Sequence, residues 1–111
     1  MQEKIVMVIE NDLMLKMEIV LKDDDLDKNE IDDMYYIIDK LFEEKNIVPS
    51  EQGIYIGYDN EVDEISGDLF SFLVIAGVLS EIDWFRKKIY KWNWYEDGEV
   101  ENLIDTFEIR K

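Results

Sequence analysis

Residues 13–21, LMLKMEIVL, alternate apolar and polar side chains in the pattern of a β-strand. The apolar positions are Leu13, Leu15, Met17, Ile19 and Leu21. Successive side chains of a strand point to opposite faces, so these five share one face while Lys16 and Glu18 fall on the other. The stretch therefore predicts a half-buried strand of an antiparallel sheet.

A second apolar run precedes this strand. Lys4–Glu10, KIVMVIE, is joined to it by Asn11 and Asp12, residue types that tolerate the positive φ of a tight hairpin turn. We therefore predict that residues 4–10 and 13–21 form an opening β-hairpin. The three aspartates at positions 23–25 then end the pairing.

A helix is predicted over residues 28–45. Asp27 and Glu30 resemble a capping box at its start. Apolar side chains at helical spacing form one stripe, which comprises Ile31, Met34, Tyr35, Ile38, Leu41 and Phe42. Asn46 suits a left-handed C-cap, and Pro49 prevents continuation of the helix. This amphipathic helix is expected to cover one face of the sheet.

The middle of the chain contains a short strand and a second helix. Ile54–Tyr58 has the composition of a strand, with Gly57 a candidate β-bulge. Leu69–Leu79 is an apolar run whose length suits either a buried strand or a buried helix. We predict a helix, because its large side chains repeat at spacings of three and four. Ser80 together with Asp83 is predicted to start a further helical piece.

The chain closes with a second predicted hairpin. Ile89–Tyr95 alternates as a strand, Glu96–Gly98 forms the turn, and Val100–Ile109 returns as its partner. The resulting order ββ-α-β-α-ββ predicts an α+β fold, with helices packed on one face of a mainly antiparallel sheet. The 111 residues carry no linker or repeat, so residues 1–111 are expected to form one small domain.

Acidic side chains dominate the surface. The chain has 28 Asp and Glu against 12 Lys and Arg, a formal net charge of −16. Residues 22–68 carry sixteen of the acids and four of the bases, whereas residues 69–111 are nearly balanced. A negative surface repels nucleic-acid phosphates and anionic lipids and attracts basic proteins. We therefore expect a basic protein partner and no direct binding to nucleic acid or membrane.

The sequence carries no signal for a membrane span or for secretion. The longest apolar run, Leu69–Leu79, contains a serine and is too short to cross a bilayer. Glu3 lies ahead of the first apolar run, and no small-residue cleavage site follows that run. We expect a cytoplasmic protein.

Catalytic and metal chemistry find little support in the residue types. The chain has no Cys and no His, which removes thiolate chemistry and the commonest transition-metal ligands. In a calcium loop starting at Asp23, Lys28 occupies the position that requires Gly, and in one starting at Asp59, Glu64 does. We expect no metal and no cofactor.

One pair of acids has aromatic neighbours of the kind that line a sugar site. Glu81 and Asp83 lie near Trp84 in the sequence, but carboxylates at the start of a helix are common without catalysis. We predict a protein that is not an enzyme.

The negative charge suggests a surface that imitates nucleic acid. Carboxylates three or four residues apart on a helix lie about 5–6 Å from one another, close to the spacing of successive phosphates. The acids predicted to bind a partner are Asp23, Asp24, Asp25, Asp27, Asp32, Asp33, Asp39, Glu43, Glu44, Asp59, Glu61, Asp63 and Glu64. Reversal of Asp32, Asp39 and Glu43 to Lys is predicted to slow association with a basic partner.

Aromatic side chains are predicted to supply desolvated contact beside these acids. The candidates are Tyr55, Tyr58, Trp92 and Trp94. On a strand, Tyr90, Trp92 and Trp94 face the same way, and they either line the core, which we favour, or form an exposed ridge.

These features lead to the hypothesis of a non-catalytic inhibitor that blocks the basic surface of a nucleic-acid-handling protein. Two settings fit: an immunity or antitoxin protein against a nuclease toxin, and a phage or mobile-element inhibitor of a CRISPR or restriction nuclease. The alternative is a structural module, whose aromatic strand pairs with its own copy while the acids provide solubility. The first predicts a monomer or a small homo-oligomer that binds one basic protein, and the second a salt-insensitive homo-oligomer without affinity for such proteins.

Overall fold

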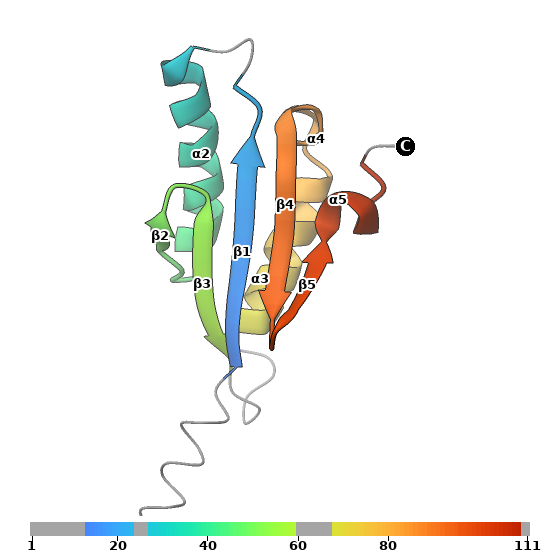
Figure 1. The fold of residues 1–111 in the computed structure, drawn as a ribbon. Helices are drawn as coiled ribbons and strands as arrows, with labels where there is room; N and C mark the ends of the chain where they lie inside the picture. Colours follow the sequence, from blue (N-terminus) through green and yellow to red (C-terminus); the bar gives the residue numbers. More distant parts are fainter. Residues whose placement is uncertain (1–12, 24–26, 60–67, 110–111) are drawn as a thin grey trace, which may run out of the picture.

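Strand β1 lies at the centre of a five-stranded antiparallel sheet, and the helices pack on one face of that sheet (Figure 1). The computed structural model describes residues 13–23, 27–59 and 68–109. Its elements are β1 (Leu13–Leu21), α2 (Lys28–Glu43), β2 (Pro49–Glu51), β3 (Ile54–Asp59), α3 (Asp68–Ser80), α4 (Asp83–Lys88), β4 (Ile89–Glu96), β5 (Glu99–Asn102) and α5 (Leu103–Thr106). The predicted α+β fold is confirmed.

The strand order is β2-β3-β1-β4-β5, so both edges of β1 are paired. Met17 lies opposite Tyr55 on β3 and opposite Trp94 on β4. The predicted hairpin partner at residues 4–10 lies outside the described residues. The places beside β1 are instead filled by β3 and β4, strands from distant parts of the chain whose apolar faces match that of β1.

The core lies between the sheet and the helices. The predicted alternation along β1 is confirmed, because Leu15, Met17 and Ile19 are buried on the helix side. The ring of Phe42 on α2 stacks on Tyr55 of β3, with ring centroids 3.8 Å apart. Aromatic pairs of this kind contribute about 0.5–1.5 kcal/mol beyond their burial. They fix α2 over the β3 side of the sheet.

The ends of α2 follow the local sequence. Asp27 is the N-cap, and its carboxylate accepts a hydrogen bond from the backbone N–H of Glu30 at 2.9 Å. The helix ends at Glu43, two residues before the predicted end. Asn46 adopts the expected left-handed conformation, with φ 63°.

Helix α3 resolves the ambiguity of the long apolar run in favour of the predicted helix. It packs against β3 where Gly57 lies. The predicted bulge at Gly57 is wrong, because this residue pairs with Leu15 in regular register. A Cβ at Gly57 would lie 2.8 Å from the Cβ of Asp68. Glycine is needed there because α3 approaches the strand closely.

A register shift lies instead between β1 and β4. Val20 pairs with Lys91 and Leu21 with Ile89, which leaves Tyr90 as the additional residue. Ile89 is fully buried, whereas the Tyr90 side chain is 62% exposed. The prediction that Tyr90 shares a face with the two following tryptophans is therefore wrong.

The C-terminal strand is shorter than predicted. The hairpin turn forms at Asp97 and Gly98, both with positive φ, but β5 ends at Asn102 rather than at Ile109. The Asn102 side chain accepts hydrogen bonds from the backbone N–H groups of the next helix, α5. Beyond that helix, the Phe107 ring stacks on Trp92 with centroids 5.3 Å apart. The segment after Asn102 thus buries apolar side chains against the core instead of continuing β5.

One edge of the sheet carries a strand that the sequence did not predict. This strand, β2, has three residues and pairs with β3.

In the described part of the chain, no helix is long and apolar enough to cross a membrane.

Candidate partner-binding surface

The predicted acidic residues are only partly brought together. Asp23, Asp33, Glu43 and Glu44 are exposed, and Asp32 is half-buried. Of the other candidates, Asp24, Asp25, Glu61, Asp63, Glu64 and the side chain of Asp59 lie outside the described residues. The part of the acidic surface that can be described is therefore centred on α2.

One flank of α2 is partly neutralised by its own bases. Lys28 forms an ion pair with Asp32 at 3.7 Å, and Lys40 forms one with Glu43 at 3.1 Å. The hydrogen bond and charge of Glu43 raise the pKa of Lys40 above its usual value. Exposed pairs of this type contribute little to stability, but they reduce the negative charge that this flank presents.

The outward stripe of α2 keeps its full charge. Glu30, Asp33 and Glu44 are all exposed, and none of them forms an ion pair with a described residue. Glu30 and Asp33 are three residues apart, which places their side chains about 5–6 Å from each other. Glu44 extends the same stripe about three helical turns further along.

Asp39, which is half-buried, has a structural role, and its contact role stays a prediction. Its carboxylate accepts a hydrogen bond from the phenolic hydroxyl of Tyr55, which is fully buried. Burial, followed by the hydrogen bond and charge of Asp39, raises the pKa of Tyr55 well above its usual value of 10.0. Asp27 is likewise engaged in the fold, as the N-cap of α2.

Most of the predicted aromatic contacts lie in the core. Tyr55 and Trp92 have no exposed surface, so the proposed contact role of these two residues is wrong, and Trp94 is only 6% exposed. The Trp92 indole N–H instead points to the sulfur of Met17 at 3.3 Å. Of the four candidates, Tyr58 alone is exposed, at 61%.

The aromatic strand β4 has no free edge. It is hydrogen-bonded to β1 on one side and to β5 on the other. A second copy of the chain therefore has no place to pair with β4 edge to edge, as the alternative hypothesis of a structural module would require.

A second acidic group, which the sequence did not predict, lies on the β4–β5 hairpin. Glu96 and Glu99 are direct cross-strand partners, and Glu101 lies opposite Trp94. Their side chains share the helix side of the sheet. Like charges directly opposite each other across strands are destabilising. Nevertheless, none of the three forms an ion pair with a described residue.

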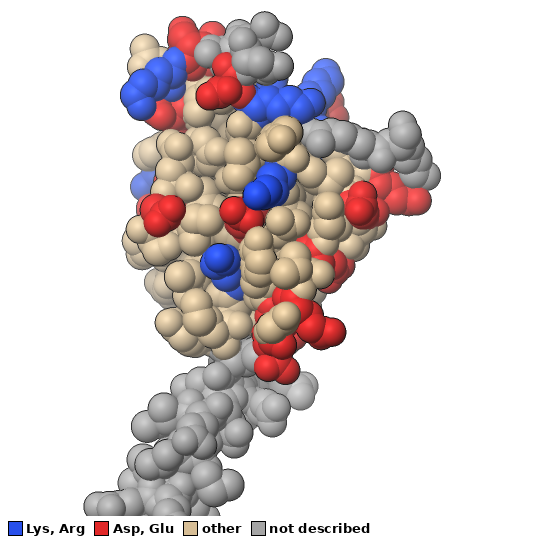
Figure 2. Space-filling model, in the orientation of Figure 1, with Lys and Arg blue, Asp and Glu red and all other residues tan. Residues whose placement is uncertain are grey.

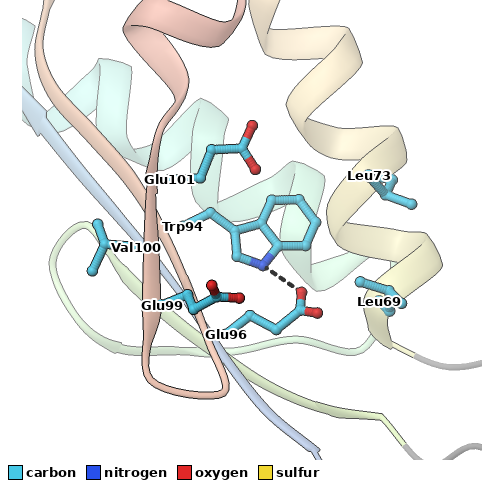
Figure 3. A pocket seen from close by; sticks show the side chains of 7 residues that line it. All are labelled: Leu69, Leu73, Trp94, Glu96, Glu99, Val100 and Glu101. Carbon is cyan, nitrogen blue, oxygen red and sulfur yellow. Dashed lines mark hydrogen bonds between the residues drawn. The ribbon is translucent and has the colours of Figure 1, made fainter.

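These carboxylates border a pocket of about 370 Å³ between the hairpin and the start of α3. Figure 3 shows that the acidic side chains gather around the Trp94 indole, opposite two leucines of α3. The Trp94 N–H donates a hydrogen bond to Glu96 Oε1 at 3.1 Å. Leu73, on the opposite wall, is 55% exposed. The pocket thus combines apolar walls with an anionic border.

The charge count of the sequence concealed this group. Residues 69–111 are nearly balanced because Arg86, Lys87, Lys88 and Lys91 offset the acids. Three of these bases lie on α4, and Lys91 lies near the start of β4, about 17 Å from its far end. In Figure 2, acidic atoms cluster at the hairpin end, whereas basic atoms lie over the middle of the face and, beside further acidic atoms, at the opposite end. The sequence feature that could have revealed this acidic group is the presence of four acids within residues 96–101.

The other candidate sites do not assemble. Glu81 and Asp83 are exposed and Trp84 is half-buried, so neither carboxylate is enclosed. Within the described ranges, no group of three or more acidic, His or Cys side chains is arranged to hold a metal ion.

The chain matches no protein-family model and no curated protein.

Proposed function

We propose that this protein is a non-catalytic acidic inhibitor that binds and blocks the basic, nucleic-acid-binding surface of another protein. A nuclease is the partner that best fits this role. Both an immunity or antitoxin protein and a phage or mobile-element inhibitor would act in this way, in the cytoplasm. The uncompensated carboxylates on α2 and on the β4–β5 hairpin are the observation that carries the proposal.

The outward stripe of α2 supports electrostatic recognition. Glu30 and Asp33 lie at a spacing comparable to that of phosphates along a strand, and Glu44 adds a third carboxylate about three turns further along; none of them forms an ion pair with a described residue. A protein that binds nucleic acid gains free energy when its Lys and Arg side chains meet such charges. A carboxylate stripe supplies the same electrostatic attraction and occupies the nucleic-acid site.

The hairpin pocket supports recognition of a single cationic side chain. Lys and Arg carry an aliphatic stem and a charged head. Leu69, Leu73 and Trp94 offer apolar surface for the stem, while Glu99 and Glu101 offer carboxylates for the head. The mutual repulsion of these acids is relieved when a cation binds. The free protein thus gives up some stability that binding restores.

Affinity capture from a host lysate, followed by competition with DNA or RNA, tests the proposal. The expected partner is a basic nucleic-acid-binding protein that is retained at low salt, released at high salt and displaced by nucleic acid. A partner whose retention is insensitive to both salt and nucleic acid would contradict the proposal.

A pair of charge reversals then tests the role of α2. D33K/E44K reverses the outward stripe, and E81K/D83K makes the same change in net charge at exposed positions elsewhere. We expect the first variant to lower the association rate about tenfold and to flatten its salt dependence. The second should have a much smaller effect. Equal effects of both variants would show that only total charge matters, and would remove α2 from the contact surface.

A further inference from the structure

We infer that the face of the sheet opposite the helices, here called the open face, binds a second copy of this chain. In the part of the chain that the structure describes, the helices cover only one side of the sheet (Figure 1). The outward side chains of β1, β3 and β4 form the open face, together with Val100 of β5. This surface lies apart from the outward stripe of α2 and from the hairpin pocket, and the inference does not depend on the proposed inhibitor function.

The open face is unusually apolar for a solvated sheet. Met14 and Tyr58 are cross-strand neighbours, 50% and 61% exposed, and Val100 is 58% exposed. Ile54 and Ile56 lie beside them and are only half-buried. In an antiparallel sheet with one solvated face, polar side chains are expected at such positions. Exposed apolar side chains that gather on one face in this way are typical of an interface.

Figure 2 shows the same side of the molecule. Uncharged atoms occupy most of its centre, whereas carboxylates gather at the hairpin end. In a chain with a net charge of −16, this face is the place where an equally acidic copy meets the least repulsion.

The few polar groups of the open face are held in fixed positions. The hydroxyl of Tyr95 donates a hydrogen bond to Glu18 Oε1 at 2.9 Å. Lys16 Nζ lies over the Tyr95 ring, 4.5 Å from its centroid. Polar groups that are already ordered lose less entropy when an interface forms.

These charges complement a second copy better than a basic partner. Lys16, Glu18 and Lys91 are the charged outward side chains of β1 and β4 on this face, with a positive sum that does not attract a basic protein. A two-fold axis between two such sheets, perpendicular to β1, brings Lys16 of each copy to Glu18 of the other. The apolar side chains around this pair then meet one another, Met14 against Val20 and Ile54 against Ile56, in the reciprocal contacts of an isologous dimer.

The size of the face suits a weak complex. The 30 strand residues, with a rise of about 3.3 Å each and strands about 4.8 Å apart, give this sheet a face of roughly 480 Å². Two faces together bury roughly 950 Å², which is less than a standard specific complex buries. Sheets that pack face to face cross at about 30°. A dimer of low affinity is therefore expected.

Sedimentation equilibrium of the full chain, from micromolar to millimolar concentration, tests the inference. We expect a monomer–dimer equilibrium, with a dissociation constant that rises about tenfold or more in M14S/Y58S. V48S/F70S removes two other exposed apolar side chains, which lie outside the sheet. It should leave the dimer intact. A monomer at every concentration, or a dimer that M14S/Y58S does not weaken, would overturn the inference.

Charge exchange gives a test that folding defects cannot imitate. K16E and E18K should each dimerise poorly alone, because like charges meet across the two-fold axis. Mixed in equal amounts, they should form a heterodimer, because opposite charges then meet. Failure of the mixture to associate, with both variants folded by circular dichroism, would overturn the arrangement.

Salt separates this dimer from the proposed inhibitory complex. Two copies with a net charge of −16 repel each other, so dimerisation should strengthen as salt screens that repulsion. Binding to a basic partner should weaken under the same conditions. Loss of the dimer at high salt would contradict the open-face arrangement and would leave the inhibitor proposal unaffected.

Discussion

The phenolic hydroxyl of Tyr55, buried at the centre of the sheet, donates its hydrogen bond to the carboxylate of Asp39 on α2. A residue that the sequence suggested for a partner contact thus joins a helix to the core. The Tyr55 ring also stacks on Phe42 of the same helix. The two contacts together hold α2 over β3.

Removal of the Tyr55 hydroxyl should destabilise the protein without a loss of ring packing. Y55F is expected to lower the free energy of unfolding by about 1.5 kcal/mol, because hydrogen bonds to charged groups are stronger than neutral ones. Urea unfolding measures this change. Y58F, which alters an exposed tyrosine, should remain within about 0.5 kcal/mol of the original protein. Equal stability of Y55F and Y58F would refute the role of the Asp39 contact.

Alkaline pH should weaken the fold through the same residue. The pKa of Tyr55 is raised by burial and by Asp39, whereas an unfolded tyrosine ionises near pH 10. Above about pH 10 the unfolded chain therefore releases a proton that the folded chain retains, and stability falls as pH rises. Y55F should show a shallower decline than the original protein. Parallel profiles would mean that Tyr55 does not contribute.

The two glycines beside and within α3 should respond to alanine in opposite directions. G57A places a Cβ 2.8 Å from that of Asp68, and we expect a loss of about 1–3 kcal/mol. Gly77 lies within α3, where an added Cβ would meet no neighbouring group within 4 Å, so G77A should gain about 0.5–1 kcal/mol. Thermal or urea unfolding distinguishes these outcomes. A neutral G57A would show that α3 can move away from the strand.

The acidic side chains of the β4–β5 hairpin should destabilise the free protein and strengthen its binding to a basic partner. E99Q removes the like charge opposite Glu96 and is expected to stabilise the free protein by about 0.2–1 kcal/mol at low salt. The same change should weaken binding to a basic partner. E81Q, at an exposed position away from the hairpin, serves as the control for both measurements. If E99Q is destabilised, the two carboxylates do not repel each other in the folded state.

The last helix should depend on its cap. N102A removes the side chain that accepts hydrogen bonds from the backbone at Ile104 and Asp105, with an expected cost of about 1 kcal/mol. N102D retains an acceptor and should restore most of that loss. Unfolding curves of the two variants provide the comparison, and an equal loss in both would point to a role other than capping.

Part of the candidate surface could be predicted because it depends on local spacing. The helical period alone places Asp32 and Glu43 on a different side of α2 from Asp33 and Glu44. The burial of Trp92 does not, because it requires strands from distant parts of the chain. The hairpin acids were hidden by a count over residues 69–111, since a count ignores where the turn brings charges together.

The sequence by itself determined the elements whose period is regular and whose ends carry their own signals. The alternation along β1 and the capped, amphipathic α2 are both of this kind, because their side-chain pattern and backbone geometry depend on residues a few positions apart. The tertiary structure alone decided that β3 and β4 pair with β1, that Tyr90 turns outward, and that the chain after Asn102 forms a helix. Each of these outcomes is a competition for the same edge or the same core volume between segments far apart in the sequence. The preferences of neighbouring residues for helix or strand cannot indicate which of these distant segments occupies the edge or the core.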